Sequence, residues 1–218
     1  MYRVSEIFTS VQGEGTYTGT PSAFVRLHGC SVGCPWCDTA YTWKLPPTEV
    51  PFENLLYSEP EAALLALADA DTLAAWCDQQ PAEHVVITGG EPLEQDLVPL
   101  LERIGQFVQV ETSGTVFPAT DTLSLIDWLT ISPKFDMPGG LAVREEILHI
   151  ASEIKMPVGR ERDLEQLQEL LNRLPTPHPP IWLQPLSQSP KATRLCIEAA
   201  AANGWLVSLQ THKGAGLR

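Results

Sequence analysis

Three cysteines near the start of the chain could bind a metal together. Cys30, Cys34 and Cys37 follow one another at C-x3-C-x2-C spacing, with two glycines and a proline beside or between them. Glycine and proline permit the tight turns that would bring three thiolates to one point. Thiolates are ligands of zinc and of iron–sulfur clusters. The spacing therefore predicts a metal-binding loop.

The number of cysteines indicates which cluster the loop would hold. A 4Fe–4S cluster usually takes four cysteine ligands, whereas this loop offers three and the next cysteine along the chain is Cys77. One iron would then lack a protein ligand. An open iron can bind an amino and a carboxylate group side by side, which the methionine end of S-adenosylmethionine (SAM) presents. The loop resembles the defining motif of the radical SAM superfamily, in which an aromatic residue, here Trp36, precedes the last cysteine.

Two other interpretations of the loop stay open at this point. The three cysteines could hold structural zinc, with His28 or a distant side chain as the fourth ligand, although zinc sites favour two C-x2-C pairs. They could also be unmetallated thiols. The remaining cysteines, Cys77 and Cys196, lie in stretches with helical patterns, and we expect both in the core.

Length and composition limit the possible classes of protein. With 218 residues, 44% of them hydrophobic, the chain can bury one sizeable core, and we expect a single domain over residues 1–218. No apolar run is long enough to span a bilayer, and no signal-peptide pattern is present. Five cysteines are an odd number, which favours a reducing compartment. We therefore expect a cytoplasmic protein that does not bind membranes.

The charge is distributed unevenly along the chain. The formal net charge of −13 argues against binding to nucleic-acid phosphates. Residues 1–133 contain 4 basic and 18 acidic side chains, whereas residues 134–218 contain 10 basic and 9 acidic ones. Arg26 is thus one of few cations in the first part. Because it lies in an apolar stretch, it needs an anionic partner.

Hydrophobic patterns predict strands that alternate with helices. Predicted strands cover residues 23–28, 84–88, 107–111, 128–131, about 150–155, 181–184 and 205–209, and predicted helices cover 93–104, 160–174 and 192–202. Residues 3–11 are ambiguous between helix and strand. The acidic segment at about 44–83, interpreted as an insertion, predicts a solvated connection and one or two helices with Leu64, Leu65, Leu67, Leu73 and Trp76 on their apolar faces.

This alternation predicts the fold class. Strands that alternate with helices form right-handed βαβ units and a parallel sheet. The number of strands indicates an α/β fold of about six parallel strands curved into an incomplete TIM-like barrel. Polar residues and glycines follow the carboxyl ends of these strands, the edge at which parallel α/β folds bind ligands. The strand at 23–28 brings the cysteine loop to that edge, so we expect one site at the barrel mouth.

A second motif narrows the resemblance. Gly89-Gly90-Glu91-Pro92 follows the strand at 84–88 and resembles a superfamily motif whose backbone and carboxylate hold the amino group of SAM. Within the superfamily, the chain resembles most the 7-carboxy-7-deazaguanine synthase family, which contracts a ring in queuosine and 7-deazapurine biosynthesis. The resembling blocks cover residues 11–15, 24–27, 30–39, 86–92, 111–114, 132–134, 153–155, 184–185 and 210–213.

The resemblance implies a role for each matching position. Cys30, Cys34 and Cys37 would ligate the 4Fe–4S cluster, and Thr39 would ligate Mg2+, where the residues alone suggest a hydroxyl that caps the following turn. Residues implied to bind SAM are Trp36, Cys37, Asp38, Gly90, Glu91, Ser132, Pro133, Lys134 and Gln184. Residues implied to bind the substrate are Val11, Gln12, Gly13, Arg26 and Thr88.

The resemblance also implies a reaction. The substrate would be 6-carboxy-5,6,7,8-tetrahydropterin and the products 7-carboxy-7-deazaguanine and ammonia, through a 5′-deoxyadenosyl radical that abstracts hydrogen from C6. Arg26 can form two charge-assisted hydrogen bonds with the substrate carboxylate. Mg2+ on the same carboxylate would stabilise negative charge in the rearranging radical. The family further implies a flavodoxin- or ferredoxin-type electron donor and a homodimer.

Two other functions share some of these features. A radical SAM activase, which abstracts hydrogen from a partner protein, would need an open mouth and often has extra cysteines for further clusters. A non-enzymatic iron–sulfur or zinc module would not cleave SAM. Incubation with SAM and the carboxypterin separates the first from a synthase, and the colour of the anaerobically purified protein separates iron from zinc.

Overall fold

The backbone forms one curved, mostly parallel sheet. The computed structural model describes residues 1–45 and 47–217. The strands are β1 (Tyr2–Val11), β2 (Pro21–Leu27), β3 (Thr48–Glu49), β4 (Leu64–Ala68), β5 (His84–Gly89), β6 (Phe107–Thr112), β7 (Trp128–Ile131), β8 (Glu153–Val158), β9 (Ile181–Pro185) and β10 (Leu206–Val207). Neighbours in the sheet follow the order β10-β9-β8-β7-β6-β5-β2-β1-β4-β3. Strands β2 and β5 to β10 are parallel, and β1 is antiparallel to β2 and β4. The predicted fold class, an incomplete parallel α/β barrel, is confirmed.

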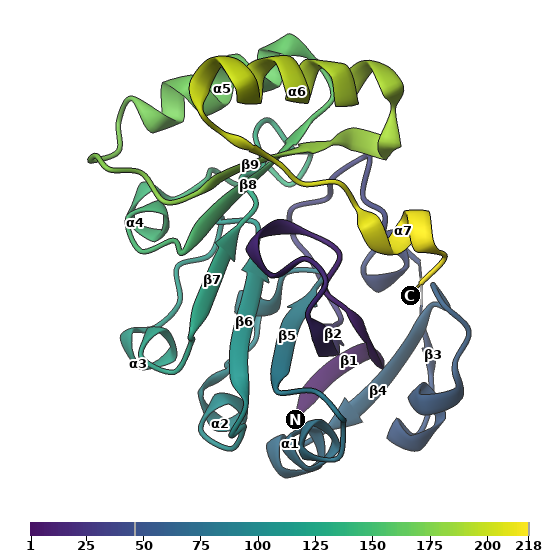
Figure 1. Ribbon diagram of the computed structural model, residues 1–218. Coiled ribbons are helices and arrows are strands. Elements are labelled where there is room, and N and C mark those ends of the chain that lie inside the picture. Colours follow the sequence, from purple (N-terminus) through teal and green to yellow (C-terminus); the bar gives the residue numbers. More distant parts are fainter. Residues whose placement is uncertain (46, 218) are drawn as a thin grey trace.

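Helices cover the outside of this sheet (Figure 1). The α-helices are α1 (Ala70–Asp78), α2 (Val98–Leu101), α3 (Thr120–Leu123), α4 (Glu145–Leu148), α5 (Glu161–Leu171), α6 (Pro190–Asn203) and α7 (Thr211–Ala215). The 3-10 helices are η1 (Gly15–Tyr17), η2 (Ala40–Thr42), η3 (Phe52–Tyr57), η4 (Pro92–Glu94) and η5 (Leu186–Gln188). Cys77 on α1 and Cys196 on α6 are fully buried in the apolar core, as expected.

The two faces of the parallel strands have opposite character, because successive side chains of a strand point to opposite sides. In β6, Val108 and Val110 belong to the apolar core beneath the helices. Gln109 and Glu111 alternate with them and hydrogen-bond to Gln12 on the concave side. The apolar core therefore lies between sheet and helices, and the concave side is left for polar groups.

The loop after β1 closes the amino-terminal end of the barrel. Tyr17 packs against His84, Phe107 and Trp128, the first residues of β5, β6 and β7, with ring centroids 4.9, 5.2 and 5.0 Å away. Gly15 lets the loop turn inward, since its φ is +65° and a Cβ there would lie 2.5 Å from a carboxylate oxygen of Glu153. The open end of the barrel is therefore the carboxyl end of the strands.

Two predictions of local structure are wrong. Residues 64–68, including Leu64, Leu65 and Leu67, form β4 and not a helix, because β1 offers them a free edge and Tyr2 pairs with Ala68. The helix predicted over 93–104 is limited to η4 and the short α2. In contrast, α1 buries Leu73 and Trp76 as expected.

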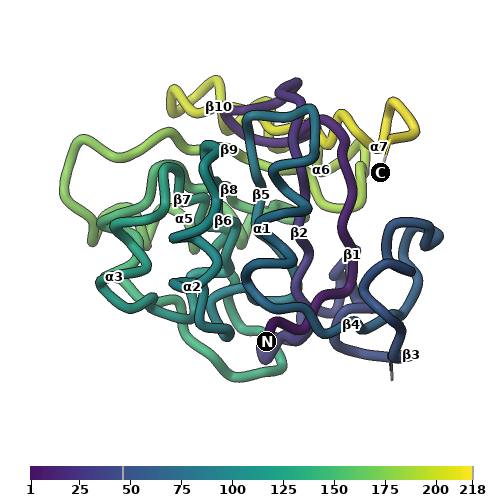
Figure 2. Tube along the Cα trace, turned by 90° about the horizontal axis from the view of Figure 1, so that it is seen from below, coloured from purple at the N-terminus to yellow at the C-terminus, as the bar shows by residue number. Residues whose placement is uncertain are grey.

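The C-terminal segment returns to the loop between β1 and β2, as Figure 2 shows. The backbone N–H of Thr211 donates to Gly13 O at 3.1 Å. In the described residues, no helix has both the length and the apolar character that crossing a membrane requires.

Candidate active site

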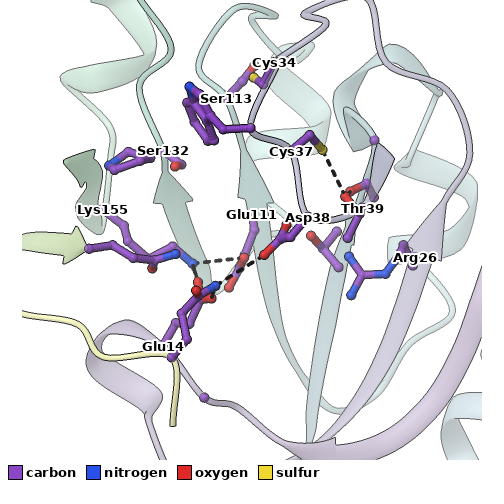
Figure 3. Close-up of a pocket in the computed structure, with 18 of the residues that line it drawn as sticks. Glu14, Arg26, Cys34, Cys37, Asp38, Thr39, Glu111, Ser113, Ser132 and Lys155 are labelled. Atoms are coloured by element: carbon purple, nitrogen blue, oxygen red, sulfur yellow. Dashed lines mark hydrogen bonds and ion pairs between the residues drawn. The ribbon is translucent and has the colours of Figure 1, made fainter. Parts of the chain in front are cut away.

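A cavity of about 270 Å³ lies at the carboxyl ends of the strands. Figure 3 shows side chains from β2, β6 and β8 and from the cysteine loop around it. The predicted site residues that line it are Val11, Gln12, Gly13, Arg26, Cys30, Cys34, Trp36, Cys37, Asp38, Thr39, Thr88, Gly90, Ser132, Lys134 and Gln184. Glu91 and Pro133 are not part of its lining. The fold thus brings residues from the whole length of the chain to one place.

The turn after β5 holds the cysteine loop in position. Glu91 N donates to Gly29 O at 2.8 Å, and Gly90 N donates to Leu27 O at 3.2 Å. A Cβ on Gly90 would overlap Gly29 O, so only glycine allows this close approach. The glycine motif therefore fixes the backbone just before Cys30.

The three thiols of the loop suit an iron–sulfur cluster. Cys30, Cys34 and Cys37 are free and all line the cavity. Burial raises the pKa of Cys34 to about 11, and the nearby Lys134 ammonium opposes this. Trp43 Nε1 lies 3.5 Å from Cys37 Sγ. Three thiolates can ligate three irons of a 4Fe–4S cluster and leave the fourth open, and an N–H donor beside a ligand sulfur influences the potential of such a cluster.

The positions of the side chains do not support a structural zinc site at the three cysteines. His28, its candidate fourth ligand, hydrogen-bonds to Ser5 Oγ through Nδ1 at 2.9 Å and does not line the cavity. Among the described residues, no group of three or more His, Cys, Asp or Glu side chains is placed to hold one metal ion.

Glu91 lies behind the cavity wall. It is 1% exposed, and its carboxylate accepts hydrogen bonds from Thr112 Oγ1 (2.6 Å), from N and Oγ of Ser113 (2.8 and 2.5 Å) and from Leu93 N (3.2 Å). Burial raises its pKa, and these hydrogen bonds oppose the rise. The carboxylate joins the turn after β5 to the turn after β6. Its role toward SAM stays a prediction.

Thr39 does not act as a cap. It occupies the residue before η2, but its side chain makes no capping hydrogen bond. Its hydroxyl lies 3.5 Å from both Cys37 Sγ and Gly89 O (Figure 3). The capping interpretation is therefore wrong, and the hydroxyl is at the cavity surface beside the cysteine loop.

Arg26 points into the cavity from β2 (Figure 3). Its Nε donates to Glu6 Oε2 at 2.8 Å, and the same oxygen accepts from Tyr41 Oη at 2.6 Å. Glu6 is the residue that the β1–β2 register places opposite Arg26. An anionic partner was expected for this arginine, and Glu6 is one that the sequence did not identify.

A charged network that was not predicted lines another part of the cavity. Lys155 Nζ donates to Glu14 Oε2 at 2.5 Å and to Glu111 Oε2 at 3.1 Å, while Gln210 Nε2 donates to Glu14 Oε1 at 2.7 Å. Burial lowers the pKa of Lys155, but the charges of Glu111 and Glu14 outweigh this effect and the pKa is raised overall. The sequence signal that could have identified these four residues is their place in the blocks that resemble the family.

The C-terminal segment is tied to the cysteine loop at the same site. Lys213 Nζ donates to Asp38 Oδ2 at 2.7 Å, and Gln210 Nε2 donates to it at 3.3 Å. Burial raises the pKa of Asp38, but the hydrogen bond and charge of Lys213 outweigh it, and the pKa is lowered overall. Asp38 therefore carries its charge at neutral pH.

Known proteins resemble this chain over almost its whole length. No family model matches it. The 7-carboxy-7-deazaguanine synthase of Escherichia coli (strain K12) is 48% identical over 221 residues, covering 97% of each chain. The enzyme of that name from Buchnera aphidicola subsp. Schizaphis graminum is 37% identical over 219 residues, again 97% of each chain. The crystal structure of QueE from Escherichia coli superposes with a TM-score of 0.85 at 45% identity, covering 95% of this chain and 93% of that one.

The sequence identity and the backbone similarity to these proteins point to the same family as the motifs at the site. The family that the motifs indicate is confirmed, together with the enzyme class that it implies. A radical SAM enzyme of this family uses an iron–sulfur cluster and SAM, and the three free thiols at the barrel mouth suit the cluster. The chain belongs to the 7-carboxy-7-deazaguanine synthase family, the radical SAM ring-contracting enzymes of queuosine biosynthesis.

Proposed function

We propose that this chain converts 6-carboxy-5,6,7,8-tetrahydropterin into 7-carboxy-7-deazaguanine with release of ammonia. The observation that carries the proposal is a single cavity bordered both by the three free thiols of the loop and by the Arg26 guanidinium. A cluster with an open iron and a carboxylate substrate would then be neighbours. The cavity volume of about 270 Å³ suits a small molecule.

Cys30, Cys34 and Cys37 would hold the cluster, and the surrounding loops would hold SAM. When bound, the two together supply the radical that removes a hydrogen atom from the substrate. The SAM site would be formed by the backbone at 36–38, Gly90 and the turn at 132–134. In the turn at 132–134, Lys134 Nζ already donates to Ser132 O at 2.9 Å, which keeps that turn closed.

Gln184 supports a ligand at this place. It lines the cavity, and its buried Oε1 has no hydrogen-bond partner among the described residues. Buried polar atoms in folded proteins almost always have a partner. A donor group of the bound cofactor would satisfy this oxygen.

Arg26 would bind the substrate carboxylate. A guanidinium can donate two parallel hydrogen bonds to a carboxylate, and the side chain reaches the cavity while its Nε is anchored on Glu6. Because Arg26 Nε is held by Glu6, the orientation of the guanidinium group is fixed. Val11, Gln12, Gly13 and Thr88 would then border the pterin ring, with Gln12 held by its hydrogen bond to Glu111 at 3.0 Å.

Thr39 would ligate Mg2+ together with oxygens of the substrate. Mg2+ prefers oxygen ligands and retains several waters, so one protein hydroxyl is enough. The hydroxyl is not used as a cap. We also propose a flavodoxin- or ferredoxin-type electron donor, a homodimer and a cytoplasmic location, where the five free cysteines stay reduced.

The test is a turnover assay with the anaerobically reconstituted protein. Mass spectrometry should find the deazaguanine when SAM, a reductant and the carboxypterin are present, and no product should form without SAM. A cluster-loaded protein that cleaves SAM but leaves the carboxypterin unchanged would refute the proposal.

Arg26→Ala tests the substrate site separately. We expect the variant to keep its iron and its SAM binding and to lose about 2–5 kcal/mol of affinity for the carboxypterin, because the carboxylate loses its paired charge. Arg26→Lys, which keeps the charge on Glu6 paired but lacks the fork, should fall between wild type and Arg26→Ala. Arg103→Ala, at a half-exposed position outside the cavity, is the control. Unchanged substrate affinity in Arg26→Ala contradicts the assignment.

A further inference from the structure

Trp43 returns over the cysteine loop after η2. Gly29 N donates to Thr42 O at 2.9 Å, so the start of the loop and the residue before Trp43 are joined. On the other side, a Cβ built on Gly33 would be 4.0 Å from Trp43 Cη2. The indole therefore lies across the loop between its glycines, and it lines the cavity.

The polar end of this indole faces one sulfur. Trp43 Nε1 donates to Cys37 Sγ at 3.5 Å. Thr39 Oγ1 lies at the same distance from that sulfur, but its single proton has a second acceptor, Gly89 O, also at 3.5 Å. The indole N–H can only donate. Of these two groups beside Cys37, Trp43 is the one that can act only as a donor.

We infer that the Trp43 indole N–H is a hydrogen-bond donor to Cys37 in the cluster-bound protein and raises the reduction potential of the cluster. This inference rests on the proposed function, because it requires the 4Fe–4S cluster at the three cysteines. Hydrogen bonds to cluster sulfurs are among the factors that set its potential. The reduced cluster carries one more negative charge, and a donor stabilises the more negative state more strongly.

Trp43→Phe tests the inference, because phenylalanine keeps an aromatic ring and removes the N–H. The matched control is Trp182→Phe, which also removes an indole hydrogen bond, the one to Thr16 Oγ1 at 3.2 Å. Iron content and visible absorbance show whether each variant holds the cluster. An anaerobic redox titration, followed by the EPR signal of the reduced cluster, gives the midpoint potential.

We expect the midpoint of Trp43→Phe to be lower than that of wild type. At the wild-type midpoint, the ratio of reduced to oxidised cluster should fall about three- to tenfold, where tenfold corresponds to ~59 mV for one electron. The midpoint of Trp182→Phe should equal that of wild type. Looser packing that let water reach the cluster would raise the midpoint, which is the opposite of the expected shift.

A second measurement applies if Trp43→Phe does not take up the cluster. Protein labelled with 15N in the tryptophan indoles is reduced and examined by pulsed EPR, with Trp36, the other tryptophan of the loop, replaced by Phe. A weak 15N coupling to the cluster supports the hydrogen bond, and no coupling overturns it.

The outcomes separate the two proposals. An unchanged midpoint in iron-replete Trp43→Phe overturns this inference and leaves the proposed function intact. Wild-type protein that takes up no iron–sulfur cluster overturns both.

Discussion

Lys155 is a buried cation between two carboxylates, and we expect its removal to be among the most destabilising single changes at the site. Its side chain is 5% exposed and lies 2.5 Å from Glu14 and 3.1 Å from Glu111. Lys155→Met keeps the length and apolar stem of the side chain and removes the charge. Both carboxylates then lose the cation that compensates them.

The expected loss is about 3–5 kcal/mol at pH 7, the cost of leaving a buried charge without its partner. The loss depends on pH with a defined sign. In wild type, burial raises the pKa of Glu14 but Lys155 outweighs it, so the pKa of Glu14 is lowered, whereas the pKa of Lys155 is raised. Their contribution is complete above the ordinary carboxyl pKa of about 4.3 and below the ordinary ammonium pKa of about 10.4.

Outside that window the contribution of the pair is lost. It is lost as the pH falls through the folded pKa of Glu14 and as it rises through the folded pKa of Lys155. In Lys155→Met the pH dependence changes sign, because burial raises the pKa of the Glu14 carboxyl once the cation that opposes this is removed. The variant is therefore expected to approach wild type in stability as the pH falls from 7 towards 4.

Urea unfolding of the metal-free protein at several pH values measures these differences. Lys155→Arg, which keeps the charge, is the control for the charge itself. The double variant Lys155→Met with Glu14→Gln should recover about 1–3 kcal/mol relative to Lys155→Met, because one uncompensated charge is removed. A loss below ~1 kcal/mol for Lys155→Met, or one that does not change with pH, would refute the reasoning.

Three further predictions concern the core, the loop and the metal. Ile87→Ala, at a fully buried position on β5, should lower the free energy of unfolding by about 2–5 kcal/mol, whereas Leu67→Ala, at a position 56% exposed, should change it by less than about 0.5 kcal/mol; urea unfolding measures both. Gly90→Ala should lower the iron bound after reconstitution, because its Cβ overlaps Gly29 O, whereas Gly105→Ala, with open space around its Cβ, should bind as much as wild type; equal iron content would contradict the role of the turn. From the proposed Mg2+ site we expect added Mg2+ to stimulate turnover by wild type but not by Thr39→Val, which should keep its cluster; an equal response of the two would exclude Thr39 as the ligand.

The sequence predicts the parallel strands well because their signals are local. Residues 84–88 and 107–111 are short, mostly apolar runs followed by turn residues, and both become strands. Residues 3–11 were ambiguous for a physical reason: β1 has a register shift between Val4 and Glu6. A bulge of this kind interrupts the period of two on which strand prediction depends.

Other parts of the structure depend on contacts that no local pattern contains. The leucines at 64–68 favour a helix by propensity, yet pairing with β1 makes them a strand. The same missing pairing explains why Glu6 was not recognised as the partner of Arg26. Lys155 and Glu14 are 141 residues apart in the sequence, so no local sequence pattern around either residue predicts their ion pair.

The sequence predicts that the candidate site residues lie together, because each belongs to a short motif at or near the end of a strand; their roles stay predictions. The structure brings fifteen of them to one cavity and places Glu91 behind it. The motif identifies the residue but not the direction of its side chain. That direction follows from the donors of Thr112 and Ser113 on the neighbouring turn.

Apolar and polar side chains alternate along strands such as β6, so the side to which each residue points matters as much as which residues the strand contains. Deleting Gln109 from the middle of β6 would reverse the side to which the later residues of the strand point, so that Val110 would face the cavity and Glu111 the layer under the helices. Catalytic surface and hydrophobic interior would be lost in one event, although no side chain had been replaced. Each of these strands therefore behaves as a segment of fixed length, and we expect the chain to accept an added or removed residue only in the connections between strands.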